Sequence, residues 1–322
     1  MTLDLSALLP EKDPRPARLL VEAELRPVQG ARFQPTGFPD LGAAVFDTRE
    51  GQRLLVESAQ SMANRLEAVC WDRARNELVP ELAGLSYVRV ERPDGQFLTS
   101  SVIEAHRLNS PYILEGKDRG LLKTLEAETK GLDEGALERS KLAAIVFGYD
   151  ASALIHGLFL AKKELVGGRL RIERALSSFI EAEGVRVAAS GGVKNDHVNP
   201  SGDTEKGFGN VPFQRDEYTA EKVTAFFSLD LAEIRGFGLG AAGERLLVAL
   251  ALFKVLSFLD APMRLRTACD FELRGTPKIA RPEGFQLPSL TTVRGALPAL
   301  IDACAKSFRG SKGVTKVAYE KA

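Results

Sequence analysis

The chain has 322 residues, of which 44% are hydrophobic and 27% are charged, close to the averages of globular proteins. Its 43 basic and 43 acidic residues give a formal net charge of zero, which weighs against a protein that coats nucleic acid by bulk electrostatic attraction. We therefore expect a protein with a substantial core, in which a local basic groove is still allowed.

Hydropathy and cysteine usage exclude several classes. No apolar run approaches the ~20 residues of a membrane-spanning helix and no secretory signal is visible, so we expect a soluble, cytoplasmic protein without a membrane partner. Cys70, Cys269 and Cys304 are far apart and form no CxxC pair, so neither a disulfide framework nor a structural zinc site is indicated.

The first half of the chain mixes the two periodicities of regular structure. Residues 18–27 alternate apolar and polar side chains as a half-buried strand does, whereas Leu55, Met62 and Leu66 belong to an apolar stripe with helical spacing. In chain order we expect a strand at 18–27, a helix at 52–72, a hairpin at 85–105 and a helix at 119–140.

The second half is richer in candidate strands. We expect strands at 142–148, 153–161, 169–177, 185–190, 223–231 and 264–273, a buried helix at 241–260 and a terminal helix at 290–307. The elements do not alternate as strand and helix, so the pattern predicts an α+β chain built around one central sheet.

Residues 190–214, SGGVKNDHVNPSGDTEKGFGNVPFQ, form a long polar segment between two expected strands. Structureless loops beyond about 12–15 residues are uncommon unless they are functional or disordered. The segment places basic side chains among Phe208 and Phe213, a combination that suits single-stranded nucleic acid because cations meet phosphates and rings meet bases. A surface loop without a ligand has the same composition, so both interpretations stay open.

A rival motif is GLGAAG at Gly238–Gly243, which matches the GxGxxG fingerprint of dinucleotide-binding folds. It follows an expected strand and begins an expected helix, as that fingerprint requires. It lies late in a chain that does not alternate strand and helix, and a glycine turn that packs a helix on a sheet explains the same letters. A nucleotide-binding enzyme therefore remains an alternative.

Three blocks of sequence carry a resemblance to a known family. They are residues 33–46 with 54–72, residues 148–161 (GYDASALIHGLFLA), and residues 171–220, which include VKNDHVNPSG and GFGNVPFQRDEYTA. Together they resemble the backbone subunit of the type I-G (formerly I-U) CRISPR Cascade-like interference complex, a member of the RAMP superfamily.

The resemblance implies a modified RRM-like (ferredoxin-like) palm with inserted finger and thumb elements. The implied division is a palm at 17–77, 141–189 and 215–308, fingers at about 78–140, a thumb at about 190–214 and a basic tail at 309–322. The long polar segment would then be the thumb.

The resemblance also implies a function. The subunit would multimerise along a CRISPR RNA without catalysing a reaction, needing neither a cofactor nor a metal, and base pairing of the guide would read the DNA target. The implied partners are CRISPR RNA, the target DNA strand paired to it, further copies of the chain, the guide-processing end-cap subunit, the large subunit and a transiently recruited helicase-nuclease.

Candidate RNA contacts follow from local chemistry and from the place of each residue in or beside the matching blocks. One subunit must accept any guide sequence, so contacts to phosphate and sugar are expected to dominate. Lys194 and Arg215 are candidates for phosphate contacts, and Phe208 or Phe213 for a wedge against a displaced base. The full set of candidates is Arg32, Ser61, Asn64, Arg65, Lys194, Asn195, His197, Phe208, Phe213 and Arg215.

A second alternative comes from the type III branch of the superfamily, in which an aspartate in the loop after the first strand cuts target RNA. Asp40, in GFPDLG, occupies a comparable loop here. An aspartate beside glycine and proline is also an ordinary turn residue. The resemblance is to the type I branch, so we expect no catalytic residue.

Overall fold

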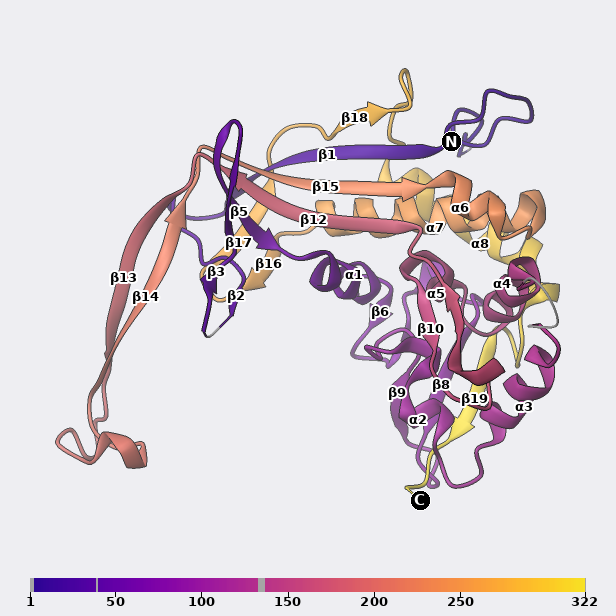
Figure 1. Ribbon diagram of the computed structural model, residues 1–322, viewed down its shortest axis with the longest axis horizontal. Helices are drawn as coiled ribbons and strands as arrows, with labels where there is room; N and C mark the ends of the chain where they lie inside the picture. Colours follow the sequence, from indigo (N-terminus) through magenta and orange to yellow (C-terminus); the bar gives the residue numbers. More distant parts are fainter. Residues whose placement is uncertain (1–2, 39, 133–136, 322) are drawn as a thin grey trace.

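The core of the protein is one antiparallel eight-stranded sheet. The computed structural model describes residues 3–38, 40–132 and 137–321. The strands of the sheet lie in the order β16-β17-β1-β15-β12-β5-β4, and β18 also pairs with β1; Figure 1 shows β1, β15 and β12 running alongside one another. The strands are β1 (Arg18–Pro27), β4 (Val45–Thr48), β5 (Gly51–Glu57), β12 (Leu176–Glu183), β15 (Lys222–Asp230), β16 (Met263–Arg266), β17 (Cys269–Leu273) and β18 (Lys278–Arg281).

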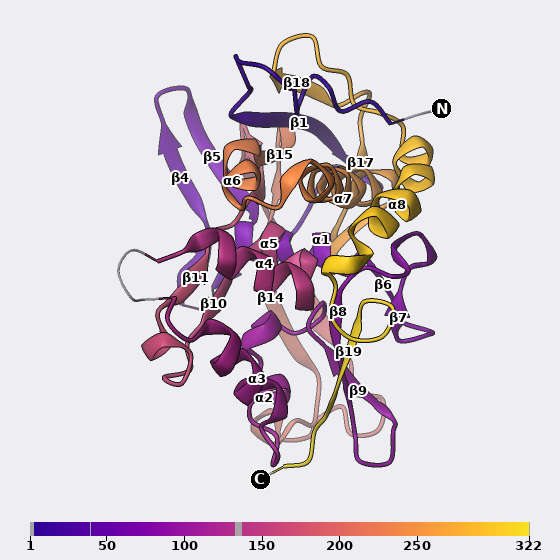
Figure 2. The same cartoon turned by 90° about the vertical axis from the view of Figure 1, so that its right-hand side faces the viewer.

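One face of this sheet is buried under helices. The expected strand at 18–27 is confirmed as β1, which pairs with β15 and buries Val21, Ala23 and Leu25. Phe227 of β15 packs against Phe258 of the long helix α7, with ring centroids 6.3 Å apart, and Figure 2 shows α7 end-on beneath β1. The helices of this layer are α1 (Ala59–Ala68), α6 (Leu231–Gly236), α7 (Gly240–Asp260) and α8 (Leu290–Cys304).

A second lobe, residues 87–172 with 314–318, hangs below one end of the sheet (Figure 1). Its own sheet has the order β19-β8-β9. β19 is parallel to β8, with pairs that run from Val314↔Tyr87 to Ala318↔Glu91. Its elements are β8 (Tyr87–Glu91), β9 (Phe97–Ser100), α2 (Pro111–Leu114), α3 (Gly120–Thr129), α4 (Arg139–Tyr149), α5 (Ala151–His156), β10 (Leu158–Leu160), β11 (Leu170–Ile172) and β19 (Val314–Ala318).

At the other end of the sheet a two-stranded ribbon projects away from the body. We call residues 186–219 the arm; it consists of β13 (Arg186–Lys194) and β14 (Val211–Thr219). Four short strands complete the fold: β2 (Gly37–Phe38), β3 (Gly42–Ala43), β6 (Trp71–Asp72) and β7 (Glu77–Leu78). Arm and second lobe extend to the same side of the sheet, with α1 between them (Figure 1).

The mixed α+β class and the central sheet are confirmed, and several expected elements match closely. The hairpin at 85–105 is β8 with β9, the strand at 223–231 is β15, and the helix at 241–260 is α7, which buries 13 of its residues. The terminal helix is α8 followed by a 3-10 turn. The helix expected at 119–140 is shorter: α3 ends at Thr129, and residues 133–136 lie outside the described part.

Two expectations about helix and strand were wrong. The helix expected at 52–72 begins only at Ala59, because Ser58 caps it by accepting a hydrogen bond from the Ser61 amide, and residues 51–57 form β5 between β12 and β4. The apolar run at 142–148, expected as a strand, lies within helix α4, and residues 151–156 are helical as well. A short run that is buried all round does not separate helix from strand by its periodicity.

Two further expectations change in detail. The strand expected at 264–273 is a tight hairpin, β16 with β17, and the turn places Ala268 at a φ of 57°. The strand expected before GLGAAG is separated from the glycines by helix α6, so Gly238–Gly243 joins two helices. The dinucleotide fingerprint requires a strand directly before the glycines, so this structure contradicts the nucleotide-binding interpretation. Among the described residues, no helix is long and apolar enough to cross a membrane.

Candidate nucleic-acid interface

The long polar segment is largely a β-ribbon, which corrects the expected loop at 190–214. β13 and β14 pair without interruption from Arg186↔Thr219 to Lys194↔Val211. The expected flanking strands are therefore not partners of each other, since β15 pairs with β12 and β1 instead. The turn itself is residues 195–210. A ribbon holds its tip at a defined distance from the body, whereas an unpaired loop does not.

The tip of the arm is organised around Asp196. Its carboxylate accepts hydrogen bonds from the amides of Val198, Asn199 and Gly209, each at 2.9 Å. These backbone donors lower the pKa of Asp196. Gly209 has a φ of +80°, and a Cβ there would lie 2.4 Å from the Gly202 carbonyl oxygen, so only glycine fits. Asp196 is thus a structural residue of the tip.

The arm exposes apolar and basic side chains together. Phe208 and Phe213 are each 50% exposed, and the side chain of the exposed Lys194 makes no hydrogen bond or ion pair with the described residues. Of the 12 large hydrophobic side chains that the described structure exposes, half lie on the arm: Val187, Val193, Val198, Phe208, Val211 and Phe213. An apolar surface of this kind on a narrow ribbon indicates that something covers it.

The base of the arm is fixed to the body. Phe33 and Tyr218 exchange backbone hydrogen bonds of 2.9 Å in both directions, and the buried Phe33 ring packs on Phe271 at 5.3 Å. Glu217 is buried and forms ion pairs with the guanidiniums of Arg215 and Arg32. The Nε of Arg215 is buried without a hydrogen-bond partner among the described residues.

A cleft of about 790 Å³ opens beside this base. One wall is β14 around Arg215 and the other is the segment Gln34–Gly37 with β3, while Arg266 also lines it. Gln34 connects the two arginines, because its side chain accepts from Arg215 at 3.2 Å and its backbone oxygen accepts from Arg266 at 3.2 Å. We call this the arm-base cleft.

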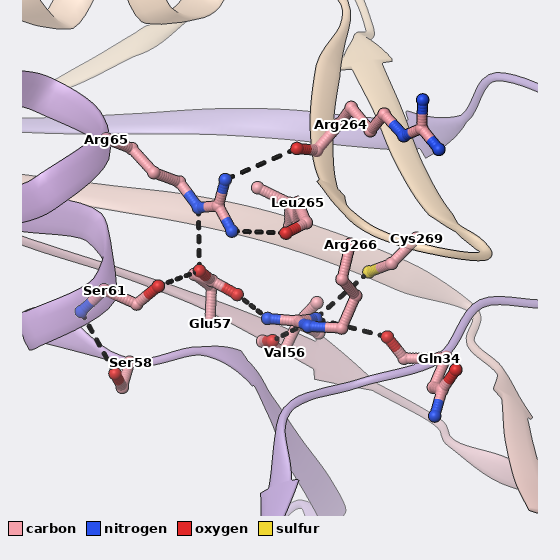
Figure 3. A network of polar contacts seen from close by, with 10 residues as sticks. All are labelled: Gln34, Val56, Glu57, Ser58, Ser61, Arg65, Arg264, Leu265, Arg266 and Cys269. Atoms are coloured by element: carbon pink, nitrogen blue, oxygen red, sulfur yellow. Dashed lines mark hydrogen bonds and ion pairs between the residues drawn. The ribbon is translucent and has the colours of Figure 1, made fainter. Parts of the chain in front are cut away.

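Behind the cleft lies a buried ionic network centred on Glu57 (Figure 3). The Glu57 carboxylate, 0% exposed at the end of β5, accepts hydrogen bonds from Arg65 Nε at 2.7 Å and from the Ser61 hydroxyl, and it forms an ion pair with Arg266. Arg65 also donates to the backbone oxygens of Arg264 and Leu265. Burial lowers the pKa of Arg65.

The network gives Ser61 and Arg65 a structural role that their sequence positions did not reveal. Their polar groups point at Glu57, and the Arg65 side chain is 26% exposed. Around the cleft, four guanidiniums share the carboxylates of Glu57 and Glu217, an excess of two positive charges, of which the exposed Asp216 offsets one. The site is therefore mildly attractive to anions.

The predicted contact residues thus fall into three groups. Arg32, Ser61, Arg65 and Arg215 belong to one chain of contacts around the cleft, and the arm carries Lys194, Asn195, His197, Phe208 and Phe213. Asn64 stands apart: it is exposed and lines a separate cavity of about 230 Å³ with Trp71 and Arg73. The sequence analysis did not single out Gln34, Glu57 or Glu217. Arg266 alone of the further network residues lies in a local cluster of basic residues, together with Arg264.

The surroundings of Asp40 bear on the alternative in which this aspartate cuts RNA. Asp40 is exposed on the turn between β2 and β3, outside the lining of the cleft. Within the described ranges, no three histidine, cysteine, aspartate or glutamate side chains are grouped so that they could hold a metal ion.

Comparison with known proteins identifies the family. The family model described as CRISPR-associated protein GSU0053 matches residues 19–187, just over half of the chain. The chain belongs to this CRISPR-associated family. A search of curated proteins finds no match. In this GSU0053-family protein the matched residues include strands β1, β4, β5 and β12 of the central sheet and the second lobe up to β11. Most of the arm, β15 and helices α7 and α8 lie after the matched residues.

Solved structures show weaker similarity. One titled "CRISPR RNA-guided surveillance complex, pre-nicking" is 15% identical, with 80% of this chain and 74% of that chain covered at a TM-score of 0.42. Another, "CRISPR RNA-guided surveillance complex", is also 15% identical, covering 92% and 78% at 0.39. Csc2 of Thermofilum pendens is 9% identical, covering 91% and 78% at 0.34.

Proposed function

We propose that this protein is the non-catalytic backbone subunit of a type I-G CRISPR interference complex and that it multimerises along the CRISPR RNA. Membership of a CRISPR-associated family supports the setting. The arm is the observation that carries the proposal. It is a rigidly based ribbon with exposed aromatic and cationic side chains and no cover from its own body.

The topology of the sheet supports an RRM-like palm. Taking β1, α1, β12, β15, α7 and β17 in chain order gives the sequence β-α-β-β-α-β, and these strands lie in the order β17-β1-β15-β12. Both helices lie on one face. This is the ferredoxin-like arrangement that RRM modules share. In this proposal the second lobe supplies the fingers, joined by β19 from the proposed tail, and the arm at 186–219 is the thumb.

The chemistry of the arm favours a sequence-independent grip. Phe208 and Phe213 offer rings to any base, and Lys194 offers a charge to any phosphate. The remaining apolar side chains, such as Val193 and Val198, suit contact with a neighbouring copy. The target DNA strand, the end-cap subunit, the large subunit and the helicase-nuclease are further proposed partners. The proposed subunit is cytoplasmic and binds no cofactor.

The test is co-expression of the chain with a CRISPR array and its neighbouring processing subunit. We expect size exclusion to give a high-mass particle and sequencing of the co-eluting RNA to give spacer-length guides. A monomer without RNA, under conditions in which the guide is made, would overturn the proposal.

An Asp40→Ala chain assembled in parallel tests the type III alternative, which requires metal-dependent cutting of complementary RNA that this substitution abolishes.

A further inference from the structure

A second open pocket lies away from the arm, between α1, the hairpin of β10 and β11, and the segment before β12. Its volume is about 740 Å³, and Gln60, His106, His156, Phe159, Arg171 and Arg174 are among its lining residues. We call it the Phe159 pocket. Nothing in the arm or the arm-base cleft uses these residues, although Arg171 and Arg174 form one of the basic clusters of the sequence.

Two flat groups, one stacked over the other, line the pocket. Phe159 and Arg171 are direct cross-strand partners in the β10–β11 hairpin, and the guanidinium lies over the ring, 5.4 Å from its centroid. Phe159 is 49% exposed, and Arg171 makes no ion pair with any described carboxylate. Aromatic rings and guanidinium planes are the surfaces on which proteins stack unpaired bases.

The pocket also carries uncompensated positive charge. Arg174 donates to the backbone oxygens of His156 and Ala59 and to the Gln60 side chain, and meets no carboxylate among the described residues. The one carboxylate in the lining, Glu173, is paired with Arg139. Arg107 is neutralised separately by Glu67, at 2.6 Å. Arg171 and Arg174 therefore remain available to an anion.

A buried imidazole completes the pocket. His156 is 1% exposed, and neither ring nitrogen has a hydrogen-bond partner among the described residues. Burial, followed by the charges of Lys254, Arg107 and Arg174, holds the pKa of His156 well below its usual value. A neutral imidazole donates from one nitrogen and accepts at the other, and buried polar groups without partners are rare. His156 therefore borders the pocket as a buried group unpaired within the described residues and is not a direct contact for a ligand.

We propose that the Phe159 pocket binds one nucleotide of a single strand, with its base stacked on the Phe159–Arg171 pair and its phosphate held by Arg171 and Arg174. A stacking surface beside two cations without carboxylate partners among the described residues fits a nucleotide better than an acidic peptide, which would leave the flat pair unused. The inference deepens the proposed function and rests on it, because it adds a second contact to the same nucleic acid.

The test uses the full chain with fluorescently labelled single strands of RNA and of DNA. We expect Phe159→Ala and Arg171→Ala each to weaken binding about fivefold or more, and Arg171→Ala also to lower the slope of log affinity against log salt by about 1. Phe46→Ala and Arg294→Ala, at an exposed ring and an exposed cation elsewhere, should leave affinity unchanged. Strands carrying 5-iodouracil should photocrosslink to the peptide that contains Phe159.

The outcomes separate the two proposals. Crosslinking with RNA alone or with DNA alone supports the pocket and identifies the strand that enters it. Parent-like affinity of both pocket variants, or crosslinks only at the arm, overturns the pocket while the backbone function stands. A parent chain that binds neither nucleic acid overturns both. An acidic peptide whose binding both pocket variants weaken, while strand affinity stays parent-like, would overturn the nucleotide assignment and give the pocket to a protein partner.

Discussion

Glu57 lies at the end of β5, where its buried carboxylate meets two guanidiniums and a hydroxyl. Removing one partner of a buried ion pair leaves uncompensated charge in the interior, which typically costs about 3–5 kcal/mol. We expect Glu57→Gln to lower the free energy of unfolding by about that amount, measured by urea denaturation. Glu272→Gln, which breaks the exposed pair with Arg26, is the control and should cost about 0–1 kcal/mol.

Arg65 and Lys194 were both predicted to contact RNA, but their surroundings differ. Arg65 is tied to Glu57 and two backbone oxygens, whereas Lys194 is exposed and its side chain has no partner in the part of the chain that the structure describes. Arg65→Ala should destabilise the RNA-free protein by about 1–3 kcal/mol, because it leaves buried polar groups unpaired. Lys194→Ala should leave stability unchanged and lower the salt slope of RNA binding by about 1. Thermal melts and RNA titrations of the two variants distinguish these roles; equal stability of both would contradict the assignment.

Asp150 is a buried residue with a predictable pH dependence. Burial raises its pKa to about 6, while its carboxylate caps α5 by accepting from the Ala153 amide at 3.1 Å. The folded chain therefore binds this proton more tightly than the unfolded chain does, and the contribution of Asp150 to stability falls as the pH rises from about 4 to about 6.

Asp150→Asn removes this ionisation and keeps a capping oxygen. We expect the variant to be more stable than the parent at pH 7, by at most about 3 kcal/mol, and to lose that part of the slope between pH 4 and 6. Urea unfolding across this range measures it, with Asp270→Asn at an exposed site as control. A variant that is less stable than the parent at pH 7 would show that the carboxylate makes contacts the amide does not replace.

At the scale of elements, the arm is a two-stranded ribbon that packs on the body only at its base. Such ribbons are marginally stable on their own. Between the Ser190–Arg215 pair and the tip, we expect the amides of β13 and β14 to exchange with solvent rapidly in the free chain. They should become protected when RNA or a neighbouring copy binds. Hydrogen exchange followed by mass spectrometry measures this, and β1 serves as the internal reference because it pairs on both edges. Equal protection with and without RNA would contradict the expectation.

Elements whose signal is local were predictable, and elements that depend on distant partners were not. β1 and α7 follow from their own periodicity and composition. β5 lies between the neighbouring β4 and β12, which is more than 100 residues away, and its apolar residues also fit a helix, so its own sequence did not identify it as a strand. The strand expected at 185–190 is the first part of β13, but its glycine-rich continuation to Lys194 shows no alternation, and only β14 gives it a ladder.

The site follows the same rule. The arm's aromatic and cationic residues were visible because they are adjacent in sequence, and so was the need for a functional explanation of so long a segment. The Glu57 network was not visible, because Arg266 reaches Glu57 across 209 positions of sequence. The Phe159 pocket was also hidden, since Phe159 and Arg171 meet only through the β10–β11 register.

At the scale of the whole molecule, the proposed function requires arm and body to act on one strand. We expect Phe208→Ala combined with Phe213→Ala to abolish high-mass particles on RNA while the free chain melts as the parent does, because both rings are half exposed. Phe46→Ala is the matched control. Mass photometry with and without RNA measures particle mass. Particles of parent-like mass from the double variant would show that the assembly contacts do not depend on these two rings.

The parallel pairing of β19 with β8 has a consequence for how the protein is made. Val314 must reach Tyr87, 227 positions earlier in the chain. At synthesis rates of about 5–20 residues per second, β8 waits roughly 10–45 s with one edge open. An unpaired strand edge is a template for unwanted association. The second lobe is therefore exposed to misassembly during translation, for a period set by the synthesis of everything between the two strands.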